Sequence, residues 1–99
     1  MINKKYKDKL TSTTELLKAL SHNTRLCIVC KLSKGELNVS QMQDCLDIPQ
    51  STVSQHLSIL KLRGIIEGRK EGSEVYYSLI NKDVEELIKV FFDIKEIPD

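Results

Sequence analysis

The sequence predicts a mainly α-helical domain that also contains one small β-hairpin. Apolar residues recur at helical spacing through most of the first 63 residues and again after residue 81. Between these regions the period changes to that of strands, because residues 65–70 and 74–79 flank a short turn that contains Gly72. A chain of 99 residues with 40% hydrophobic and 29% charged residues is expected to form a single folded domain, 1–99.

The first part of the chain is expected to form a basic arm and two helices. Residues 1–9 contain four lysines against one aspartate and make up the arm. Leucines at helical spacing predict a helix over residues 10–20, and a second apolar stripe predicts a helix over residues 23–33. Gly35 is placed to end that second helix.

Two further helices are expected on either side of a short turn. Residues 39–46 form the first of them, with Asn38 as N-cap and Gln41 as its capping-box partner. Pro49 favours the start of the next helix, residues 50–63, which Gly64 ends. Its core stripe at positions i, i+4 and i+7 consists of Val53, Leu57 and Leu60.

The order of these elements is that of a winged helix-turn-helix. The helix-turn-helix spans residues 39–63, the hairpin or wing spans residues 65–79, and a last amphipathic helix spans residues 81–94. In this architecture the second helix of the pair lies in the major groove of DNA, and the hairpin lies beside it.

The helix at residues 50–63 has the surface chemistry that such a role requires. Residues 48–66 contain two basic residues and no acid, although the net charge of the chain is only +1. Small hydroxyl side chains allow a close approach to bases, and glutamine can pair bidentately with adenine. The candidate DNA-binding residues of this helix are Gln50, Ser51, Thr52, Ser54, Gln55 and Ser58.

Two other segments carry candidate DNA contacts. Ser40 and Gln41, at the start of the preceding helix, are expected to hold a phosphate through side chains and free N–H groups. The candidates on the wing, for the DNA backbone or minor groove, are Arg69, Lys70 and Ser73.

Each of these features also has a structural interpretation. Ser51 and Thr52 are suitable for helix capping alone, and Arg69 and Lys70 are suitable for protecting an edge strand by charge. The occurrence of all the features in the required order favours the DNA-binding interpretation.

The composition restricts the remaining function classes. No apolar run is long enough to span a membrane, and no apolar segment follows the basic N-terminus as in a secretory signal, so we expect a cytoplasmic protein. No nucleophile, histidine and acid occur in an order that suggests an enzyme, and no cofactor motif is present.

Residues 16–79 resemble the ArsR/SmtB family of winged-helix repressors. The match rests on AL-S-x-x-TRL from Ala19, on QSTVSQHL from Gln50, on the wing and on VYYSL from Val75. The resemblance implies a homodimer built from the first and last helices, which binds an imperfect palindrome in double-stranded DNA and is released by an inducer. Half-sites would then lie about 34 Å apart.

The family's metal sites are not kept in this sequence. Asn38 and Ser40 stand where metal-sensing members carry a thiolate pair, and the last helix contains neither histidine nor cysteine. Soft metals need thiolate or imidazole ligands, so no metal site is assigned. In this respect the pattern is most similar to the family's non-metal repressors of plasmid-borne virulence genes.

Cys27 and Cys30 are the candidate redox residues. On a helical wheel they fall opposite the apolar side of their helix, near Lys31 and Lys34, which would lower the pKa of the thiols. Oxidation, a two-thiolate metal contact and packing at the dimer interface all remain open. In redox-sensing family members the partner cysteine lies on the last helix, where this chain has none, and Cys45 is expected to be inert.

The sequence therefore predicts a dimeric, sequence-specific DNA-binding repressor, for which cysteine oxidation rather than metal binding is the candidate switch. The alternatives are a winged-helix module for protein interactions and a metal-sensing repressor that uses Cys27 and Cys30.

Overall fold

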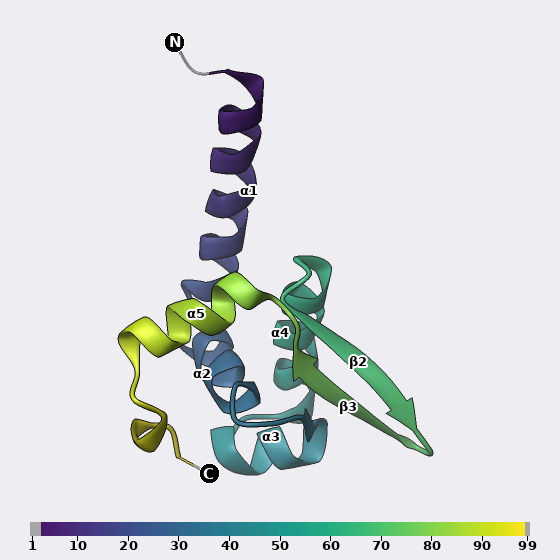
Figure 1. Cartoon of the computed structure of the whole chain (residues 1–99). Coiled ribbons are helices and arrows are strands. Elements are labelled where there is room, and N and C mark those ends of the chain that lie inside the picture. The colour runs from purple at the N-terminus through teal and green to yellow at the C-terminus, as the bar shows by residue number, and fades with distance from the viewer. Residues whose placement is uncertain (1–2, 99) are drawn as a thin grey trace.

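The computed structural model describes residues 3–98, without the side chain of Cys45 (Figure 1). Predictions for residues 1, 2 and 99 and for the Cys45 side chain lie outside the described residues. The elements, in chain order, are α1 (Lys4–Leu20), α2 (Asn23–Leu32), β1 (Leu37–Asn38), α3 (Val39–Leu46), α4 (Gln50–Leu62), β2 (Ile66–Glu71), β3 (Glu74–Leu79), α5 (Lys82–Phe91) and the 3₁₀ helix η1 (Ile94–Glu96).

The order of elements confirms the predicted fold class, a mainly helical domain with a small antiparallel sheet. In Figure 1, α1 projects from the body of the domain and the wing, formed by β2 and β3, projects on another side. The three residues of the predicted core stripe of α4, Val53, Leu57 and Leu60, are at most 2% exposed. They pack with residues of α2, α3, the wing and α5, among them Ile28, Met42, Ile66 and Val84.

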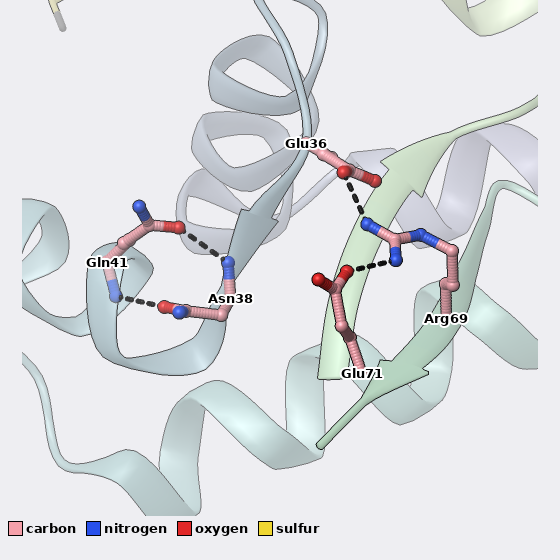
Figure 2. Close-up of polar contacts among 5 residues, drawn as sticks. All are labelled: Glu36, Asn38, Gln41, Arg69 and Glu71. Atoms are coloured by element: carbon pink, nitrogen blue, oxygen red, sulfur yellow. Dashed lines mark hydrogen bonds and ion pairs between the residues drawn. The ribbon is translucent and has the colours of Figure 1, made fainter. Parts of the chain in front are cut away.

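Local signals fix the start of α3 and the end of α4. The Asn38 side-chain oxygen accepts from the Gln41 N–H, and the Gln41 side-chain oxygen accepts from the Asn38 N–H, both at 2.9 Å (Figure 2). This is the predicted capping box. After α4, Gly64 adopts a φ of 70°, and the Gly64 and Ile65 N–H groups donate to Lys61 and Leu60 carbonyls at 3.0 Å. This Schellman motif turns the chain from α4 into the wing.

The sheet contains one strand that the sequence did not predict. Its strand order is β1-β3-β2, and Leu37 and Asn38 of β1 pair with Tyr77 and Tyr76 of β3. A two-residue strand has no readable period, so its formation depends on the free edge that β3 offers. The pairing holds the start of α3 against the base of the wing.

The first helix begins earlier and the last one ends earlier than predicted. Asn3 caps α1 by accepting from the Tyr6 N–H at 2.8 Å, so described residues 4–9 of the expected arm form the first turns of α1. The prediction that the last helix reaches residue 94 was wrong. Phe92 has an extended φ of −129°, and the chain turns into η1, after which Ile97 returns to the core.

Within residues 3–98, none of the helices is both long and apolar enough to cross a lipid bilayer.

Candidate nucleic-acid interface

The exposed side of α4 has the composition that the sequence predicted. Because Val53, Leu57 and Leu60 are buried, the opposite side of the helix faces solvent. Gln50, Ser51, Ser54, Gln55 and Ser58 are exposed and Thr52 is half-buried. The Ser58 hydroxyl donates to the Ser54 carbonyl at 3.0 Å, which leaves its oxygen able to accept.

The first turn of α4 has no side-chain cap. Pro49 occupies the N-cap position, and no side-chain hydrogen bond is formed there. The interpretation of Ser51 and Thr52 as capping residues alone therefore has no support in the geometry. The exposed hydroxyls and the leading N–H groups of α4 share one end of the helix, an arrangement that suits a phosphate.

At the start of α3 the two candidate residues differ in their availability. Ser40 and Gln41 are both exposed. The Gln41 amide oxygen and its N–H are already used in the capping box, which leaves its side-chain NH₂ as the group available to an external acceptor. Ser40 has no such commitment to the capping box.

A cluster of nitrogen-bearing side chains fastens the other side of α4 to the junction of α1 and α2. Arg25 Nε donates to the Ala19 carbonyl at 2.6 Å, and Arg25 Nη1 lies 3.3 Å from His56 Nδ1. The ring centroids of His22 and His56 are 4.6 Å apart, and His22 Nδ1 accepts from the Thr24 N–H at 3.1 Å. A guanidinium only donates, so His56 accepts at Nδ1 and carries its proton at Nε2.

This environment favours the neutral form of His56. Burial lowers the pKa of the His56 ring below its usual value, and His22 and Arg25 lower that pKa further. Sequence reasoning missed this cluster, since it considered the histidines only as metal ligands. The signal available in the sequence was that His22 and Arg25 lie in the AL-S-x-x-TRL motif at the start of α2 and that His56 lies in the QSTVSQHL motif of α4.

On the wing, Arg69 is exposed but engaged with two acids. Its guanidinium donates to Glu36 Oε1 at 2.6 Å and to Glu71 (Figure 2). It also lies 5.5 Å from the centre of the Tyr76 ring. The hydrogen bonds to Glu71 and Glu36 raise the pKa of Arg69 above its usual value. Lys70 and Ser73 are exposed. Contact between Arg69 and a phosphate therefore requires an exchange of partners.

Cys30 was predicted to lie outside the apolar side of its helix, but the structure buries it. It is only 6% exposed and belongs to the hydrophobic core, whereas Cys27 is half-buried. The expected lowering of the thiol pKa was also wrong for Cys30, because burial and the neighbouring Cys27 raise that pKa more than Lys31 lowers it. The physical reason is that the chain after α5 folds back over this face. There, Lys34 Nζ donates to the Ile97 carbonyl at 2.9 Å.

Among the residues with described side chains, no group of three or more His, Cys, Asp and Glu residues could hold a metal ion. Cys27 and Cys30 form only a pair of this kind.

The comparisons with known proteins place this geometry in one family. The profile described as "Bacterial regulatory protein, arsR family" matches residues 22–67. The transcriptional repressor PagR of Bacillus anthracis is 46% identical over 88 residues, which are 87% of this chain and 87% of PagR.

Two solved structures show the same fold. Reduced HlyU from Vibrio cholerae has a TM-score of 0.84 at 32% identity, with 90% of this chain and 94% of HlyU covered. A winged helix-turn-helix fragment from Mycobacterium bovis, described as homodimeric and DNA-binding, has a TM-score of 0.81 at 29% identity, with 91% and 83% covered.

The contact between α4 and the α1–α2 junction, made by His56 and Arg25, is expected to weaken in mild acid. Neutral His56 contributes stability above its unfolded-state pKa of about 6.5, and this contribution is lost as pH falls through the lower folded-state pKa. Thermal unfolding between about pH 7.5 and about pH 5.5 should show a larger fall in Tm for the wild type than for His56→Gln. Equal slopes in the two proteins would show that His56 does not titrate in this way.

Proposed function

The chain belongs to the arsR family of bacterial regulatory proteins, and from this premise we propose that it is a homodimeric repressor that reads a specific, imperfectly palindromic DNA operator. The coarser statement, that it is a transcriptional regulator of this family, follows from the relatives themselves. The observation that supports the finer one is the exposed, acid-free side of α4, which holds Ser51, Ser54 and Gln55 opposite a buried stripe.

Dimer formation is supported by apolar side chains left exposed on α1 and beyond the middle of α5. Tyr6, Leu10 and Leu17 of α1 are 54%, 43% and 46% exposed. Val90 and Phe91 of α5 are 77% and 70% exposed. A partner subunit that covered these two surfaces would remove apolar area from water and pair two copies of α4 for successive major grooves.

Gln55 is the residue of α4 that we expect to read a base. Gln55→Ala should weaken binding to an operator fragment, recovered by genome-fragment selection, by about 1–3 kcal/mol, because one bidentate amide–base contact is lost. Electrophoretic shift or fluorescence anisotropy titration measures the change, and size-exclusion chromatography should show an unchanged dimer.

An unrelated duplex serves as the internal control for Gln55. Nonspecific affinity depends on phosphate contacts, so it should be the same for Gln55→Ala and the wild type. Equal weakening on both duplexes would show that Gln55 contributes to sequence-independent binding and does not read a base. An unaltered operator affinity would show that Gln55 is not part of the interface.

The wing supports a second prediction, since Arg69 is held by Glu36 and Glu71 while the protein is free. In our proposal Arg69 exchanges these carboxylates for phosphate oxygens on DNA. Lys70 also contacts phosphate, but it has no such carboxylate partners to give up. Glu36→Gln should therefore raise DNA affinity by about two- to fivefold, because Arg69 is released more easily. The stability of the fold should change by less than about 0.5 kcal/mol, since the ion pair is exposed.

Glu67→Gln is the matched control, because Glu67 is an exposed acid on the same hairpin and has no ion pair with Arg69. It removes the same charge near the DNA. If both variants gain affinity equally, or if Glu36→Gln keeps its gain in an Arg69→Ala background, the exchange at Arg69 is not the cause.

The same experiments separate the repressor from the main alternative, a winged-helix module that binds proteins. The neutralisation of Arg69 by two acids favours that alternative more than the sequence alone did. DNA affinity that is unchanged in both Arg69→Ala and Lys70→Ala would support it.

We also propose that oxidation at Cys27 and Cys30 switches the repressor. Both thiols line one cavity on α2, and Cys27 is the more accessible of the two. Its thiolate attacks peroxide, the O–O bond breaks, and a sulfenic acid and hydroxide form. The Cys30 sulfur then displaces hydroxide from the sulfenic sulfur, and its proton leaves with it as water, which yields a disulfide. The description of the HlyU structure as reduced is in keeping with redox states in a relative.

Peroxide should lower the operator affinity of the wild type. A disulfide within α2 would distort the helix that carries Arg25, and so would disturb the contact of Arg25 with His56 on α4. Cys30→Ser should abolish the response, and mass spectrometry of the oxidised wild type should show the loss of two hydrogen atoms. Cys45→Ser is the control and should respond as the wild type does. A response that persists in Cys30→Ser would exclude the Cys27–Cys30 disulfide.

A further inference from the structure

A cavity of about 420 Å³, open to solvent on one side, lies between α2 and the chain that follows α5. Its wall consists mainly of hydrocarbon and sulfur, and most of it comes from Leu26, Cys27, Cys30, Phe92, Ile97 and Pro98. Ile97 is 7% exposed and Cys30 is 6% exposed, so the inner wall belongs to the core. An apolar cavity of this size with few polar groups is typical of a site for a small organic ligand.

Three polar residues line this cavity, namely Asn23, Lys31 and Glu96, and Lys31 is the buried one. It lines the wall, and the residue is only 7% exposed. Its ammonium donates to the Pro98 carbonyl at 3.3 Å, and no carboxylate among residues 3–98 forms an ion pair with it. A buried cation whose partner is a neutral carbonyl recovers only part of the solvation that it has lost. An anion placed here would be held more strongly than in water.

The roof of the cavity is the short segment that follows α5. Beyond η1, Ile97 inserts into the core, Lys34 Nζ donates to the Ile97 carbonyl at 2.9 Å, and Lys31 Nζ donates to the Pro98 carbonyl. An oxygen atom of a ligand can therefore take the place of the Pro98 carbonyl at Lys31 while Ile97 remains in the core. Among residues 3–98, Glu96 is the one acid that lines the wall, and it is exposed and so is screened by water.

We propose that this cavity binds a small amphiphilic carboxylate, with its apolar chain against Leu26, Phe92 and Ile97 and its carboxylate on the Lys31 ammonium. The match is one of charge and polarity: a single buried cation at the edge of an apolar wall selects one anionic head on an apolar body. The proposal concerns the reduced protein without DNA, so it does not depend on operator reading, and it shares the cavity wall of Cys27 and Cys30 with the proposed redox switch without requiring their oxidation.

The test uses the full chain under reducing conditions, with sodium decanoate as the probe and 1-decanol as its uncharged analogue. In an NMR titration below the micelle concentration, decanoate should shift the signals of Leu26, Ile97 and Phe92 and saturate. Lys31→Met keeps the length of the side chain and removes the charge, and it should weaken decanoate binding by about tenfold or more. Binding of 1-decanol should change by less than about twofold.

Two further variants make the result decisive. Lys89→Met removes an exposed lysine on α5 and should bind decanoate as the wild type does. Cys27→Phe fills the cavity, leaves Lys31 in place and should abolish binding of both probes, which keeps the test valid if Lys31→Met fails to fold. Equal decanoate affinity in Lys31→Met and the wild type would overturn the proposal. So would shifts confined to the exposed apolar residues of α1 and α5.

Discussion

The burial of one stripe of α4 is the constraint on which the rest of the domain depends. Val53 and Leu60 are fully buried and Leu57 is 2% exposed, so the helix has a single rotation about its axis that satisfies the core. That rotation places Ser51, Ser54 and Gln55 in solvent. A slip of one residue would expose leucine and bury either Ser54, Ser58 and Lys61 or Thr52, His56 and Ile59. Exposing leucine and burying these polar groups are both unfavourable. The buried stripe of Val53, Leu57 and Leu60 therefore determines which polar side chains of α4 face solvent.

Polar contacts then fix α4 relative to its neighbours along the chain. Arg25 joins the end of α1 to His56 on α4, and the Schellman motif at Gly64 joins α4 to the wing. The pairing of β1 with β3 and the contact of Glu36 with Arg69 join the wing to the start of α3. The two helices and the hairpin thus form one unit, and packed and hydrogen-bonded groups rather than a flexible linker connect the α1–α2 junction to α4.

What the sequence could predict depended on how local each signal was. The capping box of Asn38 and Gln41, the stop at Gly64 and the stripe of α4 involve residues within a few positions of one another, and all were confirmed. The strand at Leu37, the pairing of Arg69 with Glu36 and the burial of Cys30 involve residues far apart in the sequence. Cys30 does lie away from the main apolar side of α2, but Ile97 covers that face, and no helical period reveals a segment that folds back.

The two consecutive phenylalanines at the end of α5 suggest how that covered face can influence a dimer. Phe91 is 70% exposed beside Val90, on the surface that a second subunit would cover. Phe92 leaves the helix with an extended backbone and lines the cavity next to Cys30, and both rings border a depression shared with Leu17 of α1. Packed side chains are displaced rather than compressed when a neighbour grows. Because the two residues are adjacent in the chain and border the same depression, an event that displaces the Phe92 backbone would also reach Phe91. In the proposed dimer, held through α1 and α5, such a movement would change the distance between the two α4 helices, which must match the spacing of successive major grooves.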